Sequence, residues 1–354
     1  MSARQQIISW ILIVCVLSLL LYLLRAILLP FVAGAAVAYL LDPLADWLEA
    51  RGQSRTLATS TILFGFFGIM LLLLVLLLPI IEEQVIGFFT SLPGIIIKTR
   101  DWLIPLVRRL LADLPEQARS EVQHAAATSA ESGAALLGQL AKGALGSGLA
   151  LFNLLSLILI TPVVAFYLLR DWDRILARID TWLPREHGVT IRQQLREMNK
   201  VLAGFVRGQA GVCFILGCYY AIGLSVAGLQ FGLVIGIATG ILVFIPIIGA
   251  SLGFLAAIIV ALAQFWPDYL HIGIVVGIYL IGQFLEGNLI SPKLIGERVG
   301  LHPVWVMFAL LAFGTLFGFL GVLLAVPVAA VIGVLTRFAL SRYLDSRLYH
   351  GREP

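Results

Sequence analysis

The sequence predicts an all-α, polytopic helical membrane protein with about eight hydrophobic segments. Of its 354 residues, 60% are hydrophobic and only 12% are charged, whereas soluble domains carry about 25% charged residues. At a mean hydropathy of +1.00 the chain has more apolar surface than a protein core can bury, so much of that surface must face lipid. Nearly uncharged runs recur along the chain, and none alternates with period two. Because lipid satisfies no backbone hydrogen bonds, helices are the structure that fits.

The first three apolar segments form a predicted scaffold in residues 1–81. They cover 7–23, 26–41 and 57–81, and about 20 apolar residues in a helix cross the hydrocarbon layer. The first segment lacks a small-residue cleavage site and runs on into further apolar sequence. We therefore expect it to remain as a membrane span and not to be removed as a signal peptide.

Basic residues predict the orientation of the spans in the cell (inner) membrane. Arg4 precedes the first span, and Arg51 and Arg55 follow the second. Further arginines are concentrated in residues 170–204 and in a basic tail, 337–354. All of these positions fit a cytoplasmic side, so we expect both termini to be cytoplasmic. The net charge of +4 reflects these flanks and not a nucleic-acid surface.

Residues 82–147 are then expected to form an extracytoplasmic amphipathic helical arm. Apolar side chains recur there at helical spacing, as at Trp102, Leu106 and Leu110. An arm that packs on neighbouring spans or subunits fits this pattern better than a ligand-binding domain, because the stretch has no aromatic or polar cluster. Residues 148–204 follow as a predicted fourth span and a basic cytoplasmic helical segment.

Residues 205–336 are predicted to be a transport element in which spans alternate with hairpins. Residues 205–227 and 271–290 each fit one span. The runs 231–264 and 302–336 are almost uncharged, and as continuous helices they would reach about 50 Å, well beyond the hydrocarbon layer. Each run is therefore expected to fold back as a re-entrant hairpin of two short helices.

Proline and glycine residues predict where each hairpin turns. Pro246 and Gly249 lie at the middle of the first run, and Gly314, Gly318 and Gly321 lie at the middle of the second. An odd number of crossings separates the two hairpins, so they should enter from opposite sides of the membrane. Inverted-repeat transporters with broken helices that meet near the midplane have this arrangement.

The predicted solute or ion site lies near the end of the 271–290 span. Gln283 and Glu286 share one helix face, and Asn288 follows two residues later. An ionisable side chain in lipid is costly unless it faces protein or water, so Glu286 is a functional candidate. The alternative is a helix end with interfacial polar residues. Amides and one carboxylate suit a small polyhydroxylated solute, or a cation and a proton.

Other polar residues are weaker candidates for the same pathway. Arg207 begins a span and either snorkels to the interface or contacts substrate, and Gln209 lies deeper in that span. Four residues are predicted to shape the connector after the site: Pro292, Gly296, His302 and Pro303. His302 is expected to cap the following helix.

Enzyme chemistry has little support in the sequence. GASLG (249–253) matches a serine-nucleophile pattern around Ser251, but that pattern needs a strand-to-helix elbow, and the only bases nearby are His271 and His302. The three cysteines lie in apolar runs without metal or disulfide spacing, and there is no P-loop or H-E-x-x-H sequence. We therefore expect no enzyme activity, no metal and no cofactor beyond a coupling proton or sodium ion.

The chain resembles the autoinducer-2 exporter family of PerM-like permeases over essentially its whole length. The resemblance is strongest in RGQ (207–209), in IPIIGASLG (245–253), and in the block from Gln283 and Glu286 through VGLHP (299–303) to GFLGVLLAVPVAA (318–330). One departure is the apolar FIPIIG, which leaves few polar groups at the first hairpin. The resemblance implies about eight hydrophobic segments, an extracytoplasmic insertion after the third, and secondary transport by a homo-oligomer.

The resemblance supports transport more strongly than it supports a particular solute. Family members are described as exporters of the quorum-sensing signal autoinducer-2, and some as sodium or lithium/proton antiporters. We expect an efflux permease for a small polar metabolite, in which residues 205–336 shift against a scaffold of residues 1–204. The alternatives are a monovalent cation/proton antiporter that uses the same site, and a membrane scaffold that transports nothing.

Overall fold

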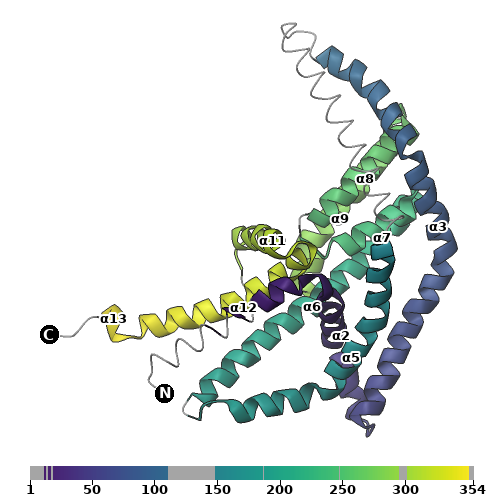
Figure 1. Ribbon diagram of the computed structural model, residues 1–354. Helices are drawn as coiled ribbons and strands as arrows, with labels where there is room; N and C mark the ends of the chain where they lie inside the picture. The colour runs from purple at the N-terminus through teal and green to yellow at the C-terminus, as the bar shows by residue number, and fades with distance from the viewer. Residues whose placement is uncertain are drawn as a thin grey trace. The chain divides into compact units, whose positions relative to one another are not determined.

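The computed structural model describes residues 19–110, 148–185, 187–246, 248–294 and 301–350, together with Leu12, Cys15 and Val16. Within these residues the chain is helical and contains no strand (Figure 1). The longer helices are α2 (Leu29–Glu49), α3 (Arg55–Leu110), α5 (Gly148–Trp182), α6 (Gly188–Val226), α7 (Gly232–Leu242), α8 (Ile248–Phe265), α9 (Tyr269–Leu285), α11 (Pro303–Phe317) and α12 (Phe319–Leu344). Short segments are η1 (Arg25–Ile27), η2 (Glu286–Ile290), α10 (Ser291–Leu294) and α13 (Arg347–His350).

The fold class predicted from composition is confirmed. Within the described residues, seven helical segments are long and apolar enough to cross a membrane. Many large apolar side chains on them are exposed, as with Leu72 and Leu74 of α3 and Phe214 of α6. A soluble domain does not expose so much contiguous apolar surface, whereas a helix in lipid does. The chain is a polytopic helical membrane protein.

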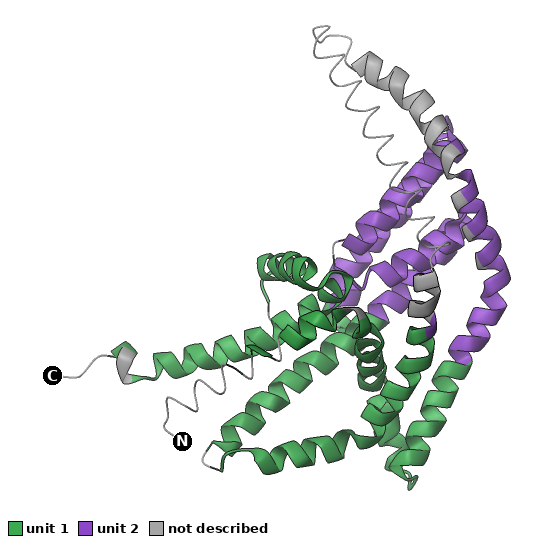
Figure 2. Ribbon diagram, viewed as in Figure 1, with its two compact units in different colours: residues 1–68, 156–210, 292–354 green, residues 69–155, 211–291 purple. Residues whose placement is uncertain are grey.

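The helices form two compact units (Figure 2). Unit 1 comprises residues 1–68, 156–210 and 292–354, and unit 2 comprises residues 69–155 and 211–291. The second predicted hairpin therefore belongs to unit 1, whereas the first belongs to unit 2. The sequence predicts that both hairpins belong to one transport element, residues 205–336.

The core of unit 1 is built on small residues of α2. Ala38, Leu41 and Ala45 are buried and lie on one helical face, where they pack against Leu63 of α3 and Leu169 of α5. Spacings of three and four residues place these side chains on one side of a helix. Because alanine is small, the helix backbones approach closely, which is the packing mode expected between membrane helices.

The α11–α12 pair in unit 1 forms a helical hairpin that turns at Gly318. The two helices pack against each other, and Gly318 has a φ of 63°, a conformation that glycine adopts readily. A Cβ atom at Gly321 would overlap the carbonyl oxygen of Phe313, so only glycine permits this approach. His302 caps α11, because its Nδ1 accepts a hydrogen bond from the Val304 backbone N–H at 3.3 Å.

The α7–α8 pair in unit 2 is a second hairpin, and the helix breaks between Leu242 and Ile248. Pro246 lies in the break. A Cβ atom at Gly249 would overlap the carbonyl oxygen of Leu242, so the start of α8 lies directly against the end of α7. Each break falls where the sequence predicts a turn. Whether either hairpin is re-entrant in a bilayer stays a prediction.

Two boundaries differ from those that the sequence suggests. The predicted span 205–227 is the second half of α6, because no helix-breaking proline separates it from the basic segment before it. The predicted arm, 82–147, begins as a direct continuation of α3 to Leu110. Residues 111–147 of the arm, most of the first predicted span and Gly296 lie outside the described residues.

Candidate functional site

A cavity of about 430 Å3 in unit 2 lies between the start of α8 and the end of α9. Its wall consists of Pro246, Ala250, Ser251, Phe254, Tyr279, Leu280, Gln283, Glu286, Gly287 and Ser291. Polar groups are few, and they come from α8 through Ser251 and from the α9 side through Gln283, Glu286 and Ser291. Binding sites for small molecules commonly have this size and this mixture of an apolar wall and a few polar groups.

Glu286 enters the cavity wall at a change of helix type. The five residues from Glu286 to Ile290 form a π-helical segment, in which the backbone N–H of Ser291 donates to the carbonyl oxygen of Glu286. In an α-helix, residues five apart would point about 140° away from each other. The wider π turn brings them onto one side, which is why Glu286 and Ser291 both line the cavity. Such π segments are frequent at functional sites.

One oxygen of the Glu286 carboxylate is not satisfied by the residues that the structure describes. Its Oε2 atom is buried and has no hydrogen-bond partner among the described residues. A buried polar atom without a partner costs about 1 to 3 kcal/mol, and more when it is charged. Neutralisation or a bound group that donates to the carboxylate removes this cost. The arrangement can therefore bind a proton, a cation or a hydroxylated solute.

The structure brings some of the predicted site residues together and separates others. Gln283, Glu286 and Pro246 line the cavity. Asn288 lies outside the cavity wall, exposed, and its amide nitrogen donates to the carbonyl oxygen of Phe284 at 3.0 Å. The hinge glycines of the second hairpin and the connector residues Pro292, His302 and Pro303 belong to unit 1.

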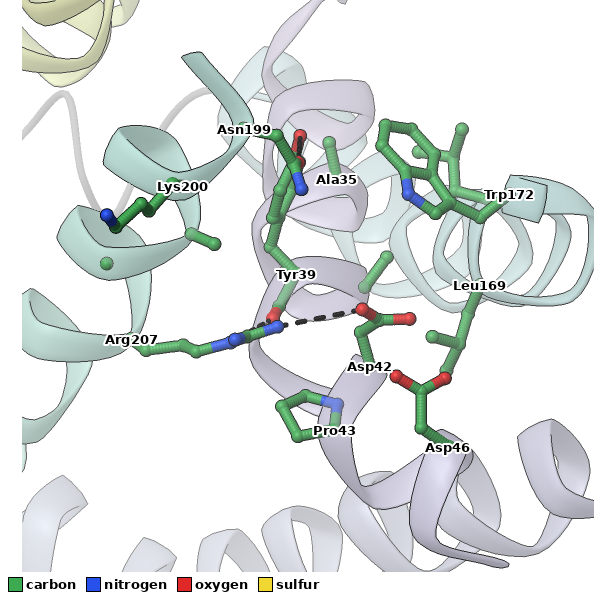
Figure 3. Close-up of a pocket in the computed structure, with 14 residues that line it drawn as sticks. Ala35, Tyr39, Asp42, Pro43, Asp46, Leu169, Trp172, Asn199, Lys200 and Arg207 are labelled. Carbon is green, nitrogen blue, oxygen red and sulfur yellow. Dashed lines mark hydrogen bonds and ion pairs between the residues drawn. The ribbon is translucent and has the colours of Figure 1, made fainter. Parts of the chain in front are cut away.

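Arg207 and Gln209 also belong to unit 1, where Arg207 lines a second cavity of about 390 Å3 (Figure 3). Its Nε atom donates to the carbonyl oxygen of Tyr39 at 2.9 Å, and its Nη2 atom lies 3.6 Å from the carboxylate of Asp42. Gln209 is buried in α6 with 4% of its surface exposed. In the same cavity the Tyr39 hydroxyl donates to Asn199 Oδ1 at 3.0 Å.

A cluster of ion pairs beside this second cavity was not predicted. The guanidinium of Arg55 donates to Asp42 at 2.9 Å, to Asp46, and to Glu49 at 3.2 Å. It also donates to the carbonyl oxygen of Leu169 at 3.1 Å. In the sequence, Arg55 indicates only the cytoplasmic end of a span. The available signal was the spacing of the three carboxylates along α2, which puts them on one face near the start of α3.

The nucleophile pattern around Ser251 gains no histidine base from the cavity wall. Ser251 lines the unit 2 cavity, but no histidine is among the residues of its wall. His271 stacks on Phe265 with ring centroids 4.9 Å apart, and Phe265 lies about 21 Å along α8 from Ser251. The His271 ring is held by Asp268, with Nδ1 and Oδ2 2.6 Å apart. This hydrogen bond lowers the pKa of the Asp268 carboxyl.

Comparisons with known proteins point to transport. A family model described as AI-2E family transporter matches residues 7–340. The Escherichia coli (strain K12) protein PerM, which is named as a permease, is 31% identical over 320 residues that cover 88% of this chain and 87% of PerM. The Bacillus subtilis (strain 168) protein YrrI, which is named as a transport protein, is 30% identical over 314 residues that cover 88% of this chain and 86% of YrrI.

Proposed function

This chain belongs to the AI-2E transporter family, and on that premise we propose that it exports a small polar solute, such as autoinducer-2, by alternating access. Family membership supports a membrane transporter. The solute, the direction of transport and the mechanism are our proposal. The observation that carries it is the unit 2 cavity, whose wall contains a carboxylate with a buried, unpartnered oxygen.

The cavity fits a small hydroxylated solute better than a large or apolar one. Ser251 and Gln283 supply neutral donors and acceptors, and Glu286 supplies a carboxylate. Phe254, Tyr279 and Leu280 contribute apolar or aromatic surface against which carbon atoms of the solute can pack. A volume of about 430 Å3 lies at the small end of the range for ligand pockets.

Glu286 is the proposed coupling group. An ionised carboxylate in a medium of low dielectric constant is costly unless it is paired, so the empty site favours uptake of a proton or a cation. Arrival of the solute supplies hydrogen bonds that replace this partner. The carboxylate thus binds either the coupling ion or the solute, and this exchange links the two fluxes.

The moving part in this proposal is residues 205–336, of which 211–291 lie in unit 2 and carry the cavity. Both termini face the cytoplasm of the cell, in keeping with the distribution of arginine, and the protein works as a homo-oligomer.

The test is flux of autoinducer-2 from sealed liposomes that contain the purified protein. We compare the wild type with Glu286→Gln, which removes the charge and keeps the shape, and with Glu83→Gln as the matched control. Glu83 is exposed on α3, so its change should leave flux unaltered. We expect Glu286→Gln to abolish coupled export while the protein remains folded and inserted.

Two outcomes would change this conclusion. Undiminished flux through Glu286→Gln would remove Glu286 from the mechanism. A pH-sensitive dye inside the liposomes tests the second function: if a sodium pulse moves protons in the wild type but not in Glu286→Gln, and autoinducer-2 does not move, the chain is a monovalent cation/proton antiporter at the same site.

A further inference from the structure

Tyr220 of α6 carries a second buried oxygen without a partner. Its side chain is fully buried, with 0% of its surface exposed. Its hydroxyl group has no hydrogen-bond partner among the described residues. Buried tyrosines usually pair their hydroxyl group, and a phenylalanine would fill the same space without an unsatisfied atom. The sequence presents Tyr220 only as one more aromatic residue in an apolar run.

The Tyr220 hydroxyl lies on the α9 face that carries Glu286. It packs directly against Gly282, where a Cβ atom would overlap the hydroxyl oxygen. Gly282 precedes Glu286 by four residues, which is about one helical turn on the same face. Among the described residues of unit 2, the two unpartnered oxygens therefore belong to positions about one helical turn apart on one side of α9.

The neighbouring hydroxyl groups of Thr239, Tyr279 and Tyr219 all have hydrogen-bond partners. Thr239 donates to the carbonyl oxygen of Ile235 at 2.7 Å, and its oxygen lies 3.1 Å from the Tyr279 hydroxyl. Because the Thr239 proton is engaged, Tyr279 is the donor in that pair. Tyr219 donates to the carbonyl oxygen of Ile278 at 2.9 Å. Tyr220 stacks on Tyr279, with ring centroids 4.6 Å apart, yet its own hydroxyl is left over.

We propose that Tyr220 is a specificity-determining residue of the transport site, and that its hydroxyl and Glu286 Oε2 together receive one hydroxyl group of the solute. A solute hydroxyl donates its proton to the carboxylate and accepts the proton of Tyr220, so both oxygens gain a partner. Because Gly282 has no Cβ atom, the Tyr220 hydroxyl comes close to the α9 backbone one turn before Glu286. The inference rests on the proposed function and deepens it, because it assigns the class of solute as small polyhydroxylated compounds.

The experiment combines variants of the protein with variants of the solute. Transport of autoinducer-2 and of a set of analogues, each lacking one hydroxyl group, is measured in liposomes for the wild type and for Tyr220→Phe. We expect Tyr220→Phe to reduce transport efficiency for autoinducer-2 about tenfold. We expect one analogue, the one that lacks the recognised hydroxyl, to be transported equally by both proteins.

Tyr219→Phe is the matched control, because it removes a hydroxyl group from the adjacent residue. Its hydroxyl is hydrogen-bonded, so we expect the variant to have a lower melting temperature but the wild-type order of solute preference. Tyr220→Phe, which loses no hydrogen bond to the part of the chain that the structure describes, should melt at the wild-type temperature or above it. If Tyr220 had only a structural role, Tyr220→Phe would lower the melting temperature and keep the wild-type order of solute preference.

Two results would overturn the inference. The first is an equal loss of transport for autoinducer-2 and for every analogue in Tyr220→Phe. The second is no loss for any of them; if autoinducer-2 flux is then still lost in Glu286→Gln, the proposed function stands and this inference fails. If the wild type does not transport autoinducer-2 at all, both fail.

Discussion

Replacing Arg55 with methionine should destabilise unit 1 by about 2 to 3 kcal/mol. The Arg55 side chain is 13% exposed, whereas Asp42, Asp46 and Glu49 are 27%, 60% and 47% exposed. Methionine keeps much of the apolar stem but leaves three carboxylates without their shared cation. The carbonyl oxygen of Leu169 also loses its Arg55 donor.

The magnitude follows from how far each carboxylate is buried. The hydrogen bond to Asp42 is the least exposed, and a hydrogen bond between charged groups contributes about 1.5 to 3 kcal/mol. The more exposed pairs with Asp46 and Glu49 contribute a few tenths of a kcal/mol each. Among the described residues Asp42 then retains only Arg207, at 3.6 Å, so repulsion among the carboxylates is poorly compensated after the change.

The assay is the free energy of unfolding of the purified protein in micelles, by denaturant titration. Arg174→Met is the matched control: Arg174 is 83% exposed and pairs with Asp171 at 3.5 Å, so its loss should cost less than about 0.5 kcal/mol. An additional Asp46→Asn change should recover part of the loss in Arg55→Met. If Arg55→Met costs no more than Arg174→Met, our assignment of the cluster to stability is wrong.

Two further predictions concern the hairpin and a helix cap. Gly321→Ala should destabilise the protein by roughly 1 to 3 kcal/mol, because the new Cβ would overlap the Phe313 carbonyl oxygen. The control is Gly273→Ala, whose Cβ would lie in open space and which should stabilise α9 by about 0.5 to 1 kcal/mol. Equal melting temperatures for the two variants would contradict the steric argument. The pKa of Asp268 is lowered by its hydrogen bond with His271 and by backbone N–H groups of α9, so its stabilising effect is present above about pH 4 and is lost as the pH falls further. Asp268→Asn should remove this part of the acid dependence of unfolding, and an unchanged acid profile would show that the cap has no such role.

Much of the fold follows from the sequence because it depends on local features. Lipid as the solvent follows from hydropathy, and the breaks near Pro246 and Gly318 follow from residues that cannot continue a helix. The shared position of Gln283 and Glu286 follows from helical spacing. These features require only neighbouring residues, so a linear pattern reveals them.

The features that sequence analysis missed depend on residues far apart in the chain or on a rare helix type. Arg55 meets the carboxylates of α2 only after α2 and α3 pack. Tyr220 reads as a core aromatic until the structure shows that its hydroxyl is unpartnered beside Gly282. The π segment that begins at Glu286 has no sequence signature, since EGNLI fits an α-helix equally well. The assignment of the second hairpin to unit 1 likewise depends on tertiary contacts.

The π segment at residues 286–290 inserts one extra residue into the helical path from α9 to α10. The residues of α10 are out of phase with α9 by about 100°, the rotation that one residue adds to an α-helix. Deleting Gly287 would remove the extra residue of the π segment and restore α-helical geometry through this region. The deletion would leave this region apolar and helical, but it would turn the residues after the deletion away from the side that Glu286 occupies. Length at this point of the chain is therefore as constrained as residue identity.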